Sequence, residues 1–169
     1  VADWGIAANV AQIINAVGGT SAVSFSNAGA ATNSASATNW DAGSGVKYWM
    51  VEVNTAGYNS ITLSSKQRST GTAPRDFMLE YRIGAAGAWT AIPGGNIIAA
   101  TDFTTGVVNN LPLPAACDDQ PSVFIRWIMS ANTAVNLAAV TAGGNSNIDD
   151  IRIRGFLIAG ASSPDNYFR

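Results

Sequence analysis

Alternation of apolar and polar residues is the feature that most constrains the fold of this chain. From residue 21 onward the alternating runs are interrupted about every 8–12 residues by Gly, Pro, Asn or Asp. Because side chains of a strand point alternately to opposite faces, such runs predict half-buried β-strands. The expected strands are 22–26, 46–54, 59–67, 75–83, 87–92, 95–100, 105–111, 122–131, 135–141 and 147–157. About ten short strands predict an all-β sandwich of two packed antiparallel sheets.

The two ends of the chain lie outside this pattern. Residues 1–20 carry Ile and Val at helical spacing before Gly18 and Gly19, which predicts a short N-terminal helix or extension. The β-sandwich module is expected over 21–160, and 161–169 form a C-terminal tail. The chain starts with Val1 and ends at Arg169, so we expect a module of a larger polypeptide.

Residues 27–45 are rich in Ala, Ser, Asn and Gly and carry no clear alternation. We expect a long loop there. Long loops in compact domains often bear ligands or function.

The composition excludes several classes of function. Charged residues make up 12% of the 169, against about 25% in an average soluble protein, and the net charge is −2. Nucleic acid and anionic membranes are therefore disfavoured as partners. The absence of His removes catalysis by an imidazole base and His-ligated metals. No apolar run reaches the roughly 18 residues of a membrane span. We expect a soluble monomer whose lone Cys117 is a small buried hydrophobe.

Charged residues gather on the polar side of the expected strands. Nine Lys and Arg and eleven Asp and Glu are present in the chain. Seven of these are expected on one sheet face: Glu52, Lys66, Glu80, Arg82, Arg126, Arg152 and Arg154. One interpretation is a solvated face with cross-strand ion pairs worth about 0.2–1 kcal/mol each. The other is a concave ligand-binding face, where Arg and Glu bond hydroxyls or carboxylates.

A third interpretation makes Glu52 and Glu80 the acid and base of a glycoside hydrolase. Such a pair needs its carboxyl groups about 5–9.5 Å apart. Any two strands that carry charged residues would produce a similar pair, so the pattern is not specific.

Aromatic residues supply a second kind of contact, because apolar faces of sugar rings stack on flat side chains. The alternation predicts Trp49 and Trp127 in the core. Four others are candidates for ligand binding, with core or rim packing as the alternative: Trp40, Tyr48, Tyr58 and Trp89.

The adjacent carboxylates Asp149 and Asp150 are the candidate metal ligands. Calcium binds six to eight oxygen atoms, many of them from carboxylates. The alternation points Asp149 inward, where a buried carboxylate needs a cation or hydrogen-bond donors. An aspartate bonded to the backbone explains the pattern equally well.

Several segments together resemble a known kind of module. They are KYWMVEVNTAGYNSITLSSKQRSTGTAPRDFMLEYRIGAAGAWTAI, LPLPAAC, VFIRWIMSANT and GGNSNIDDIRIRG. The most specific pieces are Gln67-Arg68-Ser69, Arg126-Trp127 and Ile148-Asp149-Asp150-Ile151. Over about residues 22–157 the chain resembles bacterial extracellular β-jelly-roll modules of the carbohydrate-binding-module or galactose-binding-like kind.

The resemblance implies a jelly-roll β-sandwich with a concave sheet that sometimes bears a ligand. It also implies a structural calcium held by Asp149 or Asp150, with oxygens from residues 27–41. The function it implies is a non-catalytic, secreted or cell-surface module that holds a parent protein on a β-linked plant or microbial polysaccharide. The alternative is a structural or adhesion spacer of a bacterial surface protein, because fold alone does not fix function.

Overall fold

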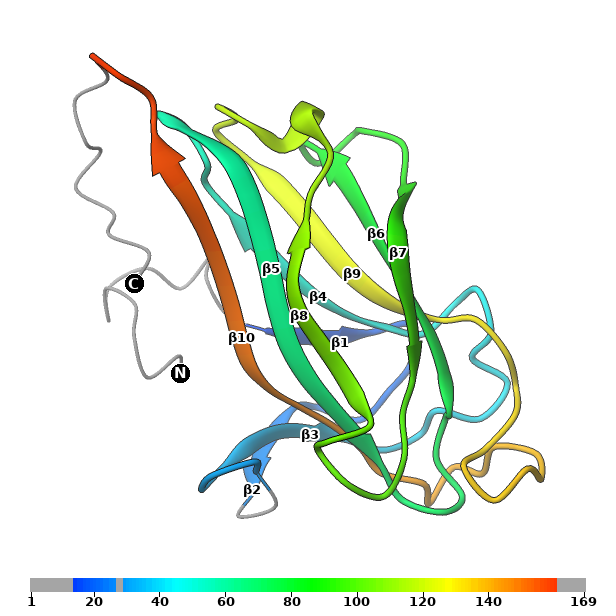
Figure 1. Cartoon of the computed structure of the whole chain (residues 1–169). Coiled ribbons are helices and arrows are strands. Elements are labelled where there is room, and N and C mark those ends of the chain that lie inside the picture. Colours follow the sequence, from blue (N-terminus) through cyan, green and yellow to red (C-terminus); the bar gives the residue numbers. More distant parts are fainter. Residues whose placement is uncertain (1–13, 27–28, 161–169) are drawn as a thin grey trace.

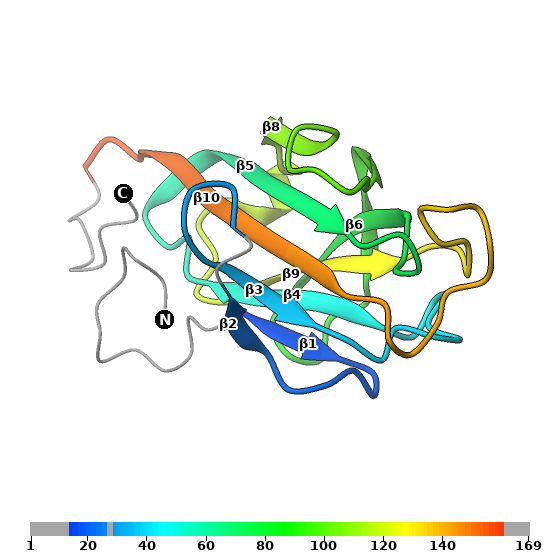
Figure 2. The same cartoon turned by 90° about the horizontal axis from the view of Figure 1, so that it is seen from below.

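The computed structural model describes residues 14–26 and 29–160, which form two five-stranded antiparallel sheets (Figure 1). Sheet A has the order β1 (Asn15–Val17), β4 (Tyr48–Val53), β9 (Val123–Met129), β6 (Asp76–Ile83) and β7 (Thr90–Ile98). Sheet B has the order β2 (Ser24–Ser26), β3 (Ser34–Ala37), β10 (Ser146–Leu157), β5 (Tyr58–Ser69) and β8 (Gly106–Pro112). In the view from below, β5 and β10 of sheet B lie above β1 and β4 of sheet A (Figure 2). The predicted all-β sandwich is confirmed.

The core between the sheets is built around three tryptophans, Trp40, Trp49 and Trp127, all 0% exposed. An indole N–H can donate a hydrogen bond but cannot accept one, so it needs an acceptor when it is buried. The Nε1 of Trp127 donates to Ser65 Oγ at 3.1 Å, and that of Trp49 to Ser146 Oγ at 3.3 Å. Two inward-facing serines, Ser65 and Ser146, therefore supply the acceptors for two buried indole N–H groups. The prediction that Trp49 and Trp127 lie in the core is confirmed.

Strand β3 lies within residues 27–45, where a loop was predicted, and the prediction is wrong for this part. All four residues of β3 are buried, and the strand pairs with β2 and β10. Asn147 Nδ2 donates to Ser34 Oγ at 2.9 Å in this pairing. The sequence Ser-Ala-Ser-Ala is buried through small side chains, so it has no apolar alternation that would reveal a strand.

The N-terminal helix prediction fails where it can be examined. Residues 15–17 form β1, which pairs with β4, and residues 1–13 lie outside the described part of the chain. The predicted strand 135–141 is also absent: this segment consists of turns with one isolated bridge between Thr133 and Ala139.

Strand β7 joins two predicted strands, 87–92 and 95–100, across the sequence Pro93-Gly94-Gly95. Gly94 has a φ of 76°, and the pairing of β6 with β7 shifts register between Met78 and Glu80. A glycine with positive φ inside a strand is typical of a β-bulge. The turn residues here bend a strand without ending it.

Cys117 closes the short 3₁₀ helix η2 (Ala115–Cys117) and is fully buried with a free thiol, which confirms its expected packing role. Burial raises the pKa of this thiol to about 12. In the part of the chain that the structure describes, no helix has the length and hydropathy needed to cross a membrane.

Candidate functional site

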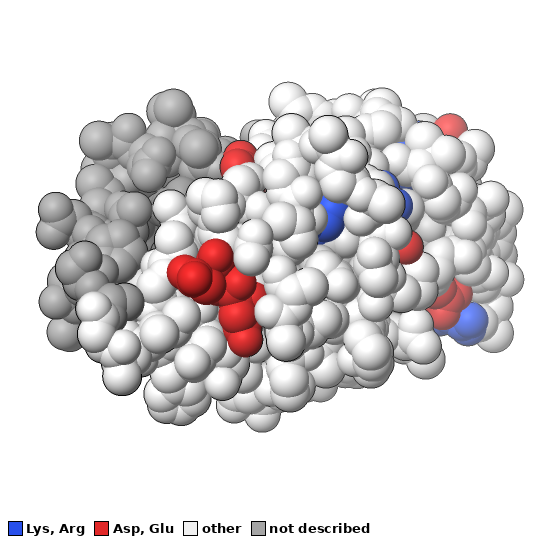
Figure 3. All heavy atoms as spheres, turned by 90° about the horizontal axis from the view of Figure 1, so that it is seen from above, with Lys and Arg blue, Asp and Glu red and all other residues white. Residues whose placement is uncertain are grey.

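The seven charged residues predicted on one face lie on two opposite faces of the sandwich. Four are on the strands of sheet A: Glu52, Glu80, Arg82 and Arg126. Three are on the strands of sheet B: Lys66, Arg152 and Arg154. The single-face prediction is wrong, because alternation separates inward from outward positions and does not say to which sheet a strand belongs. Charged groups are sparse on the end of the molecule seen from above (Figure 3).

The outer face of sheet A carries a group of side chains that we call the aromatic–arginine cluster: Tyr48, Glu80, Arg82, Trp89, Phe124 and Arg126. The strand register brings it together, since Arg126 of β9 lies between Met50 of β4 and Glu80 of β6. Residues two apart on a strand share a face, which places Tyr48 beside Met50.

Trp89 joins the cluster through the other edge of β6. Ala91 of β7 is the partner of Glu80, and Trp89 comes two residues before Ala91.

Arg126 is the centre of the cluster. Its Nε donates to Glu80 Oε2 at 2.7 Å, and its Nη2 lies 2.5 Å from the same oxygen. Its guanidinium carbon lies 4.1 Å from the ring centroid of Trp89 and 4.9 Å from that of Tyr48. Both charged side chains are 14% exposed. Attraction between the cation and the two ring faces, together with the ion pair, holds Trp89 and Tyr48 in defined positions.

Arg82 also contacts Trp89 but differs from Arg126 in its other partners. Its guanidinium carbon is 4.6 Å from the centroid of Trp89 and 4.5 Å from that of Phe124. Its Nε is buried without a hydrogen-bond partner, and no carboxylate of the described residues pairs with it. Two aromatic rings therefore hold an arginine whose Nε lacks an acceptor among the described residues.

Trp40, a predicted ligand-binding aromatic, lies in the core, so that prediction is wrong. Its ring centroid is 5.9 Å from that of Phe77, edge to face, and 5.3 Å from that of Trp49. Its Nε1 donates to the carbonyl oxygen of Ala37 at 2.7 Å. Trp40 follows the unpredicted strand β3, so no pattern in the sequence indicated that the chain turns inward here.

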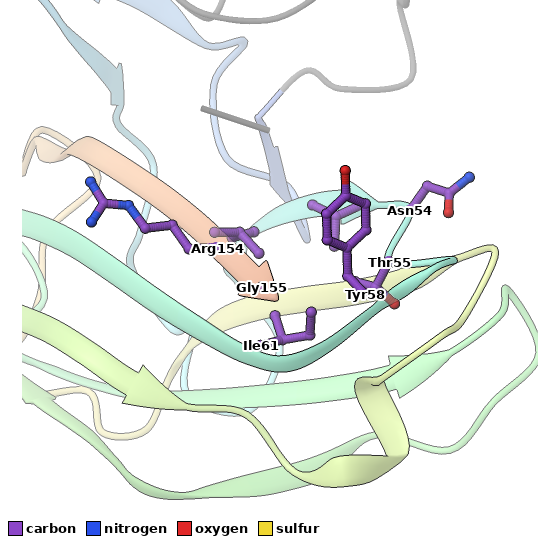
Figure 4. Close-up of a pocket in the computed structure, with 8 residues that line it drawn as sticks. Asn54, Thr55, Tyr58, Ile61, Arg154 and Gly155 are labelled. Atoms are coloured by element: carbon purple, nitrogen blue, oxygen red, sulfur yellow. The ribbon is translucent and has the colours of Figure 1, made fainter. Parts of the chain in front are cut away.

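Three further predicted binding residues are not part of the aromatic–arginine cluster. Tyr58 and Arg152 lie on sheet B, and Glu52 lies on sheet A at the edge of the cluster. Tyr58 begins β5 and lines a cavity of about 20 Å³ with Ile61 and neighbouring residues (Figure 4). That volume holds about one water molecule and no sugar. Arg152 is on sheet B with 60% of its side chain exposed, and Glu52 accepts a hydrogen bond from Ser122 Oγ at 2.6 Å.

The prediction that Asp149 points inward is wrong. Ile148 takes the buried position, and a register shift between Asp149 and Arg152 puts Asp150 at a φ of 49°. The Asp149 carboxylate accepts the backbone N–H of Ala30 at 2.7 Å and that of Asp150 at 2.8 Å. The segment 27–41 thus reaches Asp149 as expected, but it contributes a backbone N–H donor where an oxygen ligand for calcium was expected.

No group of three or more acidic, Cys or His side chains among the described residues could hold a metal ion. The Asp150 carboxylate already pairs with Lys66 Nζ at 2.8 Å. Both carboxylates therefore have protein partners without a metal ion. Calcium binding stays a prediction.

Comparisons with known proteins bear on the fold. No family model matches the chain, and no curated protein matches its sequence. The structure is similar to the N-terminal cellulose-binding domain of β-1,4-glucanase C from Cellulomonas fimi, with a TM-score of 0.50 and 10% identity over 86% of this chain and 90% of that one. A structure described as "CBM4 structure and function" has a TM-score of 0.47 and 10% identity over 85% and 94% of the two chains. At this identity the first likeness establishes a shared β-sandwich fold.

Phe124 is the cluster residue that sequence reasoning missed. Its position on β9 faces outward, yet it is only 9% exposed because Arg82 lies over its ring. The signal available was its position opposite Glu52 and Arg82, which requires the strand register to be known.

Proposed function

We propose that the chain is a non-catalytic carbohydrate-binding module that binds a β-linked polysaccharide on the outer face of sheet A. The observation that carries this proposal is the aromatic–arginine cluster, in which Trp89 and Tyr48 are partly exposed beside Arg82, Arg126 and Glu80. The fold shared with a cellulose-binding domain supports it.

The chemistry of the cluster matches that of a sugar chain. Sugar rings present apolar C–H faces that stack on Trp and Tyr, while each hydroxyl is both a donor and an acceptor. Arg82 and Arg126 offer donors, and the Glu80 carboxylate offers acceptors. A surface with both kinds of contact can bind a ring by its face and its edge together.

An open surface of this kind should bind with a Kd on the order of 10⁻³–10⁻⁵ M. Hydroxyls and protein groups are hydrated before they meet, so each hydrogen bond contributes only about 1 kcal/mol net. Such weak binding is useful when the module is part of a larger polypeptide, because it keeps the other domains close to the polymer. We therefore propose that it works in a secreted or cell-surface polypeptide with further domains, and its charge-poor surface supports this setting.

Glu52 and Glu80, the two carboxylates that a glycoside hydrolase would use, have separate partners. Glu80 pairs with Arg126, and Glu52 accepts the hydroxyl of Ser122. Their strands, β6 and β4, lie on opposite sides of β9. These contacts favour binding over glycosidic bond cleavage.

Affinity electrophoresis tests the proposal with gels containing neutral cellulose derivatives, xyloglucan, mannan, β-glucan or xylan. We expect at least one polymer to retard the protein, and Trp89→Ala to weaken that binding about tenfold, near the upper end of a stacking contribution. Phe156→Ala is the matched control, since Phe156 is a 72% exposed aromatic at the end of β10 in sheet B. Its binding should equal that of the parent protein. If no polymer retards the protein, the spacer or adhesion alternative replaces this proposal.

A further inference from the structure

A hollow of about 480 Å³ lies on the outer face of sheet B, over β5, β8 and β10. These three strands lie side by side on the opposite sheet from the aromatic–arginine cluster (Figure 1). Its lining, which we call the sheet B groove, consists of Ser64, Ser65, Lys66, Val107, Val108, Asn109, Asn110, Asp150, Arg152 and Arg154.

The sheet B groove is positively charged although the chain is not. Three of the nine Lys and Arg residues line it, and Asp150 is the acidic residue in its described lining. Asp150 pairs with Lys66 at 2.8 Å and lies 3.7 Å from Arg152. No ion pair joins Arg154 to a carboxylate of the described residues. The lining thus carries a net charge of +2 in a chain of net charge −2.

The backbone positions these cations on one surface. Arg152 lies opposite Ser64, and Arg154 opposite Thr62, so both face outward across β5. The side chains of Lys66 and Arg152 are 40% and 60% exposed. Arg154 is among the residues that line the small cavity, and its side chain extends away from Tyr58 (Figure 4). Its guanidinium is therefore not engaged by the tyrosine.

The rest of the groove consists of two valines, Val107 and Val108, and of uncharged serine and asparagine residues. Asn110 donates its backbone N–H to Ser64 Oγ at 2.9 Å, which ties β8 to β5 at the register shift beside Leu63. The side chain of Asn109 adds an amide donor and acceptor to the same lining.

From these groups we infer that the sheet B groove binds an acidic polysaccharide, with carboxylate or sulfate groups bonded by Arg152 and Arg154 and sugar hydroxyls by Ser64 and the two asparagines. Arginine matches such planar or tetrahedral oxygen groups with paired hydrogen bonds. A single-stranded nucleic acid is the weaker fit, because no aromatic side chain in the described lining could stack on a base. This inference extends beyond the neutral-glycan proposal to the other sheet and a different ligand class.

The test is affinity electrophoresis at low salt in gels with polygalacturonic acid, dextran sulfate, neutral dextran or single-stranded DNA. We expect retardation by at least one acidic glycan, weakened by added NaCl, and none by neutral dextran. Retardation by polygalacturonic acid alone assigns carboxylates as the ligand group, and by dextran sulfate alone assigns sulfate esters. The inference is overturned if neither acidic glycan retards the protein, or if DNA retards it more strongly than both.

Variants separate the groove from general charge attraction. Arg154→Gln should weaken binding to the acidic glycan about tenfold, the scale of one charge-assisted hydrogen bond. Arg75→Gln removes the same charge at a site where Arg75 pairs with Asp76 at 3.1 Å, and should leave binding unchanged. Equal weakening by both variants would overturn the inference. Trp89→Ala should keep acidic-glycan binding while its neutral-glycan binding weakens, so the two proposals can fail independently.

Discussion

Replacement of Trp40 by alanine tests whether this tryptophan belongs to the core or to a ligand surface. In the structure its side chain is 0% exposed and packs against Trp49 and Phe77. Alanine would leave a cavity between the sheets and remove the donor for the Ala37 carbonyl. Truncation of a buried Trp costs about 3–5 kcal/mol, a large part of the roughly 5–15 kcal/mol that stabilises a typical domain.

That loss should lower the melting temperature by about 6–20 °C, at about 2–4 °C per kcal/mol for a chain of this size. Thermal unfolding followed by circular dichroism measures the shift. Trp89→Ala is the matched control, because Trp89 is partly exposed and its two contacts with arginines contribute about 1–2 kcal/mol in all. The control should melt only a few degrees below the parent protein.

The glycan-binding assay, run below the melting temperature of the variant, completes the test. Folded Trp40→Ala should still be retarded by the polysaccharide that binds the parent protein. Two results together would refute the core assignment: a melting temperature within about 2 °C of the parent protein, and loss of glycan binding.

Three further predictions concern titrating groups and metal. Because burial raises the pKa of Cys117 to about 12 from 9.0, the unfolded state loses this proton first, so stability should fall as pH rises from about 9 toward 12. In Cys117→Ala, the free energy of unfolding from urea titrations should fall less steeply over this pH range. An unchanged dependence on pH would contradict this prediction. The Asp102 carboxylate accepts the backbone N–H of Thr104, which lowers its pKa to about 2, and NMR titration should find this value where a value near 4 would disprove the turn. If calcium binds at Asp149 and Asp150, at 100 times its Kd it should stabilise the protein by about 2.7 kcal/mol, whereas equal melting with calcium and with chelator, and no metal by elemental analysis, would leave two hydrogen-bonded aspartates.

The large strands could be predicted from sequence because alternation is a local property. Strands β4 and β5 bury alternate residues, as β6 does over its first half, whereas β9 buries every residue but Arg126. Trp49 and Trp127 lie inward as expected. Strand β3 could not be predicted, since Ser and Ala are small enough to be buried on both faces between two neighbouring strands.

The kinds of residue in the candidate site could be predicted, but which of them meet on one face was harder to predict. Glu80, Arg82 and Arg126 meet because β6 and β9 are neighbours in one sheet, whereas Arg152 belongs to the other sheet. The order of strands depends on contacts between residues far apart in sequence. The prediction that Asp149 points inward failed because the bulge before Arg152 shifts the alternation by one residue.

NMR chemical-shift mapping with a soluble oligosaccharide of the polymer that retards the protein most strongly tests the central claim most directly. The amide signals of β4, β6 and β9 around Arg126, together with the indole signal of Trp89, should shift in proportion to ligand, with a Kd on the order of 10⁻³–10⁻⁵ M. The outer face of sheet B around Arg154 should stay unchanged with a neutral oligosaccharide. Shifts confined to sheet B, or no shift of the Trp89 indole at saturating ligand, would contradict glycan binding by the aromatic–arginine cluster.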